Sequence, residues 1–271
     1  MNSIKETPYR KFIILSSPRS GTHMLRTVLR NHPNVVAHSE LFNPDFLKNK
    51  AFGPETPSNI ILKEHIYCQY PPNTEMVGFI IHRSGTPWGD WPDLWSTLEK
   101  DESIFVISLR RRNLLRRYLS YQVMRTFKGA KPKALKFDAN HLRADFLYQE
   151  KELQDFDARF SGHPLLKVYY EDLCNDFHHT VQSVLSFLEV DKMKLWPDIE
   201  GRPKRKLANA IENFSDLKVT FKNTSWEEFF DEDNDVKHIF KPEEDKENKS
   251  LLNKLRSFLR KVTKGAFSLF L

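Results

Sequence analysis

The segment with the clearest chemical potential begins where the apolar run 12–15 leads directly into the polar sequence Ser-Ser-Pro-Arg-Ser-Gly-Thr at 16–22. The amphipathic stretch that follows predicts a helix over 22–31, so the polar residues form a loop between a strand and a helix N-terminus. Such a loop binds anions because the first N–H groups of a helix lack partners. Gly21 lets the backbone approach a ligand, and Arg19 adds a permanent cation suited to phosphate or sulfate oxygens.

Two other interpretations of this loop stay open. An ordinary turn, in which the hydroxyls of Ser20 and Thr22 cap the helix, explains the sequence without any ligand. A Walker A loop fits poorly, because that motif requires a Lys after its second Gly. Here a second Gly and such a Lys are both missing, and the cation Arg19 precedes Gly21.

A second cluster of cations follows another apolar run in the middle of the chain. Residues 104–109 predict a buried strand, and the three arginines at 110–112 lead from it into a predicted helix over 113–126. Ser120 lies eight residues after Arg112, about two helical turns further on. A helix that folds back over the strand end would bring both side chains to one ligand with anionic oxygens. A solvated basic helix face is the alternative.

Strand-like and helix-like segments alternate along the chain. Strands are predicted over 12–16, 34–38, 76–82, 104–109 and 165–170, and helices over 22–31, 93–100, 113–126, 140–160 and 177–188. This alternation is typical of βαβ units, and it predicts an α/β fold in which helices flank a mostly parallel sheet with P-loop-like topology.

The composition is that of a globular chain with a basic balance. With 271 residues, 39% of them hydrophobic, the chain can bury one good core and a smaller subdomain. A net charge of +6 suits an anionic partner such as a nucleotide, a nucleic acid or an acidic membrane. Cys68 and Cys174 form no metal-ligand pattern, which disfavours a zinc site and leaves a reducing compartment, the cytoplasm, as the expectation. We expect no signal peptide and no transmembrane helix.

The C-terminal segment differs from the rest of the chain. After the charged linker 241–250, apolar residues recur at helical spacing, with Lys and Arg on the remaining face. The chain is therefore divided into a domain at 1–240 and a basic amphipathic tail at 241–271. A helix of this kind over 250–271 fits peripheral contact with a membrane, and docking on the domain is the alternative.

The two cation-bearing segments together resemble the sulfotransferases that use 3′-phosphoadenosine 5′-phosphosulfate (PAPS). The sequence SSPRSGTHML at 16–25 resembles the family's 5′-phosphosulfate loop, and Arg112 with Ser120 resembles its 3′-phosphate motif. The sequence YEDL at 170–173 is similar to a turn common in the family. Details such as SELF at 39–42 are closest to bacterial carbohydrate sulfotransferases, the trehalose 2-sulfotransferase-like group. The resemblance covers about 11–230 and not the tail.

The resemblance implies a P-loop-like sulfotransferase fold and a PAPS site without a metal. It assigns the 5′-phosphate to the side chain of Arg19 and to the backbone N–H groups of Ser20, Gly21, Thr22 and His23. It assigns the 3′-phosphate, which distinguishes PAPS from ATP, to Arg112 and Ser120. In this reading Arg19 stabilises the negative charge that grows on the departing phosphate during in-line transfer of the sulfuryl group.

Two residues compete for the role of the base that accepts the proton of the acceptor hydroxyl. In similar carbohydrate enzymes a Glu at the place of Glu40 is the base. In the cytosolic sulfotransferases of small phenols and steroids it is a His after a central strand, as His82 is here. Their motif has a Lys two residues before that His, whereas this chain has Ile80. We favour Glu40 as base with His82 contacting acceptor or cofactor, and a purely structural role remains the alternative for each.

The acceptor implied by the resemblance is a hydroxyl of a carbohydrate or glycolipid. One rival interpretation is a magnesium-dependent kinase of a nucleotide or small molecule with a divergent phosphate loop. Another is a basic RNA-binding protein, although the aromatic residues form no RNA-binding motif, so no nucleic-acid partner is expected. A sulfotransferase fold that binds its cofactor without catalysis is a third. The sequence does not indicate the oligomeric state.

Overall fold

The computed structural model of the chain describes residues 8–43, 56–83, 91, 93–127, 133–198 and 205–231. The chain divides into two units, Met1–Phe240 and Lys241–Leu271, and all described residues belong to the first. The predicted tail helix and its membrane contact therefore lie outside the described residues. Within the described part, no helix is both long enough and apolar enough to cross a bilayer.

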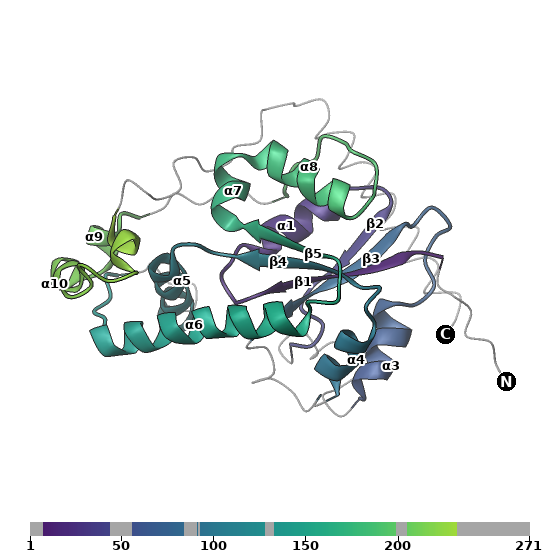
Figure 1. Cartoon of the computed structure of the whole chain (residues 1–271). Helices are drawn as coiled ribbons and strands as arrows, with labels where there is room; N and C mark the ends of the chain where they lie inside the picture. Colours follow the sequence, from purple (N-terminus) through teal and green to yellow (C-terminus); the bar gives the residue numbers. More distant parts are fainter. Residues whose placement is uncertain are drawn as a thin grey trace. The chain divides into compact units, whose positions relative to one another are not determined.

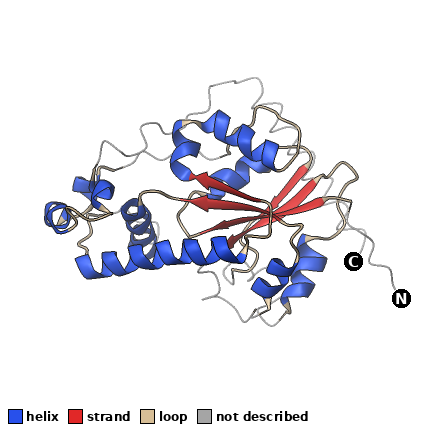
Figure 2. Ribbon diagram, viewed as in Figure 1, coloured by secondary structure: helices blue, strands red, loops and turns tan. Residues whose placement is uncertain are grey.

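The centre of the fold is a five-stranded parallel sheet in the order β2-β3-β1-β4-β5 (Figures 1 and 2). Its strands are β1 (Arg10–Ser16), β2 (Val35–His38), β3 (Met76–His82), β4 (Phe105–Arg110) and β5 (Leu165–Tyr169). The central strands are apolar over most of their length, as in the run 12–15 of β1, because helices cover both of their faces, as expected for parallel sheets. The predicted α/β fold with a parallel sheet between helices is confirmed.

One face of the sheet is covered by α1 (Thr22–Leu29), α7 (Tyr170–Asn175) and α8 (Phe177–Phe187) (Figure 1). The apolar side of α1 packs there with residues of α8 such as Val181 and Val184. The opposite face is covered by α3 (Ser58–Ile61), α4 (Leu94–Lys100) and the C-terminal part of α6 (Ala139–Arg159). The two faces thus bury the alternate side chains of the same strands, for example Ile14 on one and Ile13 on the other.

A separate apolar cluster lies where α5 (Leu114–Phe127) meets the N-terminal half of α6. The short helices α9 (Leu207–Ala210), α10 (Phe214–Thr220) and η2 (Glu227–Phe230) complete this cluster, which is rich in aromatic side chains. Asn113 caps α5, since its side-chain oxygen accepts from the N–H of Arg116 at 2.9 Å. The cluster fixes α5 at the end of β4, and α5 carries part of the predicted site.

The predicted elements agree with the structure to within two residues at every end. The strand predicted over 76–82 is confirmed without change as Met76–His82. The prediction missed α3 and the π-helical turn η1 (Leu62–Ile66), which lie in a segment for which no helix was predicted. It also missed α7, where only a turn was expected, and α9, α10 and η2, because each is too short to show a helical period.

Candidate functional site

The predicted site residues gather at the edge of the sheet where the strands end. Parallel strands place their carboxyl ends at one edge, which is where ligands bind in α/β sheets. Ser16 ends β1 and lies in register with His82, which ends β3. On the other side of β1, Ser16 pairs with Leu109 of β4, and Arg110 pairs with Tyr169 of β5. The loops that leave these strand ends carry the candidate residues.

The phosphate loop, residues 17–22, turns sharply between β1 and α1. Arg19 and Gly21 have positive φ angles of 70° and 93°, a conformation that is strained for a residue with a Cβ atom. A Cβ atom on Gly21 would lie only 2.5 Å from Cδ2 of Tyr170, so the site requires glycine. Gly21 is the N-cap of α1 and has no side chain to cap the first turn. The N-terminus of α1 therefore keeps its attraction for an anion.

The phosphate loop and α5 meet through the side chain of Arg19. Its Nε donates a hydrogen bond to Oγ of Ser120 at 3.0 Å. Nη1 of Arg111 donates to the carbonyl oxygen of Arg19 at 3.2 Å, and the Arg111 guanidinium lies 4.8 Å from the ring centre of Tyr170. Two segments predicted separately from the sequence thus form one positively charged surface.

Glu40, His82 and Ser16 form a chain of polar contacts at the same edge. Oε1 of Glu40 lies 3.0 Å from Nε2 of His82, and Nδ1 of His82 lies 3.1 Å from Oγ of Ser16. Asn43 donates to Oε2 of Glu40 at 3.1 Å, and Nε2 of His23 lies 3.7 Å from Oε1. Glu40 is thus surrounded by groups that can donate hydrogen bonds, and the two candidate bases are in direct contact.

The environment of Glu40 favours the carboxylate. Burial would raise its pKa, but the hydrogen bond and charge of His82, with smaller contributions from Asn43 and His23, lower the pKa to about 2. An ionised Glu40 accepts a hydrogen bond, so Nε2 of His82 carries a proton. The other ring nitrogen, Nδ1, shares a hydrogen bond with the hydroxyl of Ser16. Burial lowers the pKa of His23, which favours a neutral imidazole there.

Arg112 contacts a carboxylate of α7 rather than Ser120. Its Nη1 and Nη2 donate to the two carboxylate oxygens of Asp172 at 2.6 and 2.9 Å, and its guanidinium lies 3.9 Å from the ring centre of Tyr169. The neighbouring Glu171 accepts from the backbone N–H of Arg112 at 3.0 Å. Each member of the predicted pair therefore binds a different neighbour, Arg112 contacting Asp172 and Ser120 contacting Arg19.

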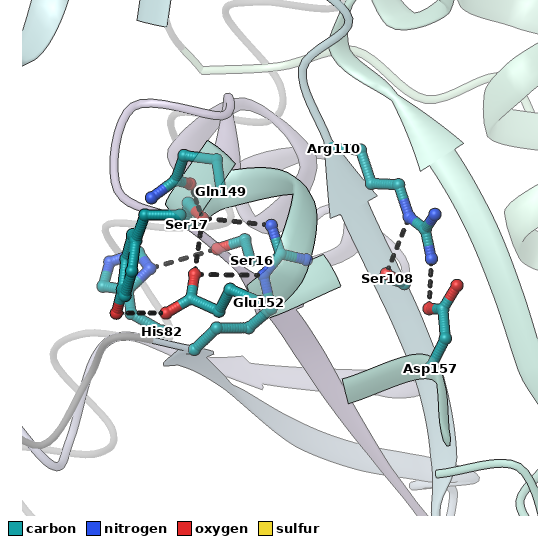
Figure 3. A network of polar contacts seen from close by, with 10 residues as sticks. Ser16, Ser17, His82, Ser108, Arg110, Gln149, Glu152 and Asp157 are labelled. Carbon is teal, nitrogen blue, oxygen red and sulfur yellow. Dashed lines mark hydrogen bonds and ion pairs between the residues drawn. The ribbon is translucent and has the colours of Figure 1, made fainter. Parts of the chain in front are cut away.

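A buried polar network contacts the phosphate loop through Ser17 (Figure 3). Ser17 donates to Oε1 of Gln149 at 2.5 Å and accepts from Nη2 of Arg83 at 3.0 Å. Nε of Arg83 lies 3.7 Å from Oε2 of Glu152, and the Arg83 residue is only 5% exposed. Burial lowers the pKa of Arg83 to about 10, while Glu152 acts against this change.

Sequence reasoning missed this support. Arg83 directly follows His82, which was a weak signal that it belongs to the site. Gln149 and Glu152 lie three residues apart on α6, and only the fold brings them under the loop. No group of three or more His, Cys, Asp or Glu side chains arranged for a metal ion occurs among the described residues.

Comparison with curated proteins finds relatives over most of the chain. Nodulation protein H of Rhizobium tropici is 28% identical over 242 residues, which cover 82% of this chain and 93% of the relative. Nodulation protein H of Rhizobium meliloti (strain 1021) is 29% identical over 253 residues, which cover 84% of this chain and 98% of the relative. No family model matches the chain.

Solved structures similar to this chain include a sulfotransferase from Alicyclobacillus acidocaldarius, with a TM-score of 0.41 and 14% identity over 78% of this chain and 90% of that one. Mouse sulfotransferase SULT7A1 in complex with PAP has a TM-score of 0.38 and 14% identity over 77% of this chain and 66% of that one. The sulfotransferase domain of the Synechococcus PCC 7002 olefin synthase has a TM-score of 0.35 and 18% identity over 71% of this chain and 78% of that one.

Proposed function

We infer that this chain belongs to the PAPS-dependent sulfotransferases and transfers the sulfuryl group of PAPS to a hydroxyl of its acceptor. One observation carries this inference: Nε of Arg19 in the phosphate loop donates to Oγ of Ser120 on α5 at 3.0 Å. The contact joins the two segments that resemble the 5′- and 3′-binding motifs of the family, although 101 positions separate these residues in the sequence. This contact supports the proposal that both motifs serve one ligand.

The phosphate loop and His23 bind the 5′ end of PAPS in this proposal. The backbone N–H groups of Ser20, Gly21, Thr22 and His23 and the guanidinium of Arg19 hold the phosphate oxygens. PAPS supplies an activated sulfuryl group whose leaving group is a phosphate. Arg19 stabilises the negative charge on that phosphate, which is the main electrostatic demand of in-line transfer.

The 3′-phosphate is assigned to Arg112 and Ser120. Arg112 follows β4 and is about half exposed, so its side chain is accessible to a ligand at the edge of the sheet. Ser120 lies two turns along α5, next to Arg19. A planar guanidinium with several N–H donors recognises a phosphate by geometry as well as by charge. This contact would distinguish PAPS from nucleotides that carry a free 3′-hydroxyl.

Glu40 and His82 act as a pair in the proposed proton transfer. A carboxylate whose pKa is about 2 holds a proton weakly, so Glu40 by itself would be a poor base. The negative charge of bound PAPS raises this pKa, and contact with His82 lets the pair share the proton that leaves the acceptor hydroxyl. Ser16 holds Nδ1 of His82 and so fixes the ring in place. The acceptor oxygen then attacks sulfur as the bond to the leaving phosphate breaks.

The acceptor is proposed to be a hydroxyl of a carbohydrate, free or as part of a glycolipid. This proposal rests on the resemblance of the phosphate loop and of the SELF sequence around Glu40 to bacterial carbohydrate sulfotransferases. A magnesium-dependent kinase is not favoured, because the phosphate loop lacks the Lys of a Walker A motif. An RNA-binding role leaves the joined motifs without an explanation.

Thermal unfolding with added nucleotides tests the cofactor assignment. We expect PAP, the desulfated product, to raise the melting temperature by a few degrees at about 100 times its dissociation constant. ADP at the same concentration should give a smaller shift, and Arg112→Ala should remove the difference. Arg125→Ala is the matched control, because Arg125 lies exposed on α5, the helix that follows Arg112. A shift with ATP and magnesium but none with PAP would contradict the proposal.

Transfer itself is measured by incubating the chain with PAPS and a panel of sugars and glycolipids. Mass spectrometry of the products reports the addition of one sulfuryl group, and Glu40→Gln should abolish it while PAP still raises the melting temperature. PAP binding without transfer to any acceptor would favour the non-catalytic alternative.

A further inference from the structure

We propose that Asp172 competes with the 3′-phosphate of PAPS for the guanidinium of Arg112. This inference rests on the proposed function, because it assumes that Arg112 recognises the 3′-phosphate. In the structure both carboxylate oxygens of Asp172 accept from the guanidinium of Arg112. The 3′-phosphate of PAPS displaces the Asp172 carboxylate from the Arg112 guanidinium. When PAP dissociates, Asp172 pairs with Arg112 again.

The contact between the two side chains has the geometry of a phosphate contact. Nη1 and Nη2 of Arg112 each donate to one oxygen of Asp172, at 2.6 and 2.9 Å. A phosphate recognised by the same two nitrogens would need the same N–H groups, so the two anions exclude each other there. The side chain of Arg112 is 49% exposed and that of Asp172 is 44% exposed, so a ligand can reach the fork and Asp172 has room to leave it.

The backbone at Arg112 is held independently of Asp172. Glu171 accepts from the backbone N–H of Arg112 at 3.0 Å and from that of Asn113 at 3.4 Å. The ring of Tyr169 lies 3.9 Å from the Arg112 guanidinium and limits where that group can move. Loss of the Asp172 carboxylate would therefore free the fork of Arg112 without releasing the chain segment that carries it.

The exchange is energetically easy because the ion pair is exposed. An exposed pair of this kind stabilises a protein only weakly, and a phosphate with close to two negative charges and three oxygens attracts the same guanidinium more strongly than a carboxylate does. A bound 3′-phosphate beside an ionised Asp172 also adds repulsion between like charges. Asp172 should therefore reduce the affinity for PAP and speed its release, while Arg112 still selects the 3′-phosphate.

Isothermal titration calorimetry of the full chain tests the inference. PAP and ADP are titrated into the wild type, Asp172→Asn, Arg112→Ala and the control Asp155→Asn, which changes an exposed carboxyl of α6. We expect Asp172→Asn to bind PAP about two- to fivefold more tightly, from the usual strength of exposed ion pairs, and to bind ADP as the wild type does. In stopped-flow displacement, PAP should dissociate more slowly from Asp172→Asn.

The outcomes separate this inference from the proposed function. If Arg112→Ala loses the preference for PAP but Asp172→Asn binds PAP equally or more weakly, Asp172 orients Arg112 rather than competing, and the inference is wrong while the assignment of Arg112 stands. If Arg112→Ala keeps the full preference for PAP, the 3′-phosphate lies elsewhere and both assignments fail. Equal tightening of PAP and ADP would also contradict competition at the 3′-phosphate.

Discussion

The contact between His82 and Glu40 predicts how activity depends on pH. In the wild type the hydrogen bond and charge of His82 outweigh burial and lower the pKa of Glu40 from 4.5 to about 2. His82→Phe keeps a planar ring but removes both effects, so burial is opposed only by the smaller contributions of Asn43 and His23, and the pKa of Glu40 should rise. The acid limb of kcat/KM, which reports the free enzyme, should then move upward from about 2 towards the ordinary value of 4.5.

The assay is the initial rate of sulfuryl transfer from PAPS between pH 4 and pH 8, with circular dichroism to confirm that each variant is folded. The wild type should keep its activity at the acid end, whereas His82→Phe should lose it progressively as the pH falls through the raised pKa of Glu40. His82→Gln is the matched control, because its amide can still donate to Glu40 but carries no charge. The acid limb of its kcat/KM profile should lie between those of the wild type and His82→Phe. An acid limb that is unchanged in His82→Phe would refute the proposed pairing.

Three further substitutions test other parts of the site. Arg19→Ala should lower kcat by about one to two decades, because charge-assisted contacts to the leaving phosphate are lost; an unchanged kcat would contradict this role. Glu152→Ala leaves the buried Arg83 without its carboxylate and should lower the free energy of unfolding in urea by about 3–5 kcal/mol. A loss below about 1 kcal/mol would argue that Arg83 is not paired there. Gly21→Ala should cost about 1–3 kcal/mol and weaken PAP binding, because its Cβ would approach Tyr170 at a strained φ; unaltered PAP binding would contradict the need for glycine.

The secondary structure was predictable because the core strands contain apolar runs that are bounded by polar residues. The run at 76–82, for example, ends where His82 and Arg83 begin the site. Shorter elements were not predictable, since a helix of four residues such as Leu207–Ala210 completes little more than one turn and shows no period. Their stability comes from the aromatic cluster with α5 and α6, which no local sequence pattern reveals.

The site was predictable only where a single segment carries both the charge and the turn that presents it. The loop with Arg19 and Gly21 meets this condition, and the helix that carries Ser120 lies beside it in the structure. The pairing of Glu40 with His82 depends on two strand ends that lie 42 positions apart in sequence. The network around Arg83 could not be predicted from the sequence, because its partners on α6 are distant along the chain and form no recognisable motif.

The three consecutive arginines after β4 show why a charge cluster in a sequence cannot be treated as one feature. Arg110 pairs with Asp157 of α6 and donates to Oγ of Ser108 at 3.1 Å, so its charge is already balanced inside the fold (Figure 3). Arg111 donates to the backbone of the phosphate loop and lies over Tyr170, which makes it a support for that loop. Arg112 is the most exposed of the three and pairs with an exposed carboxylate. The basic run therefore divides its charge between the core, the loop and the exposed edge of the sheet, and its last member is the one for which we propose an exchange of one anion for another.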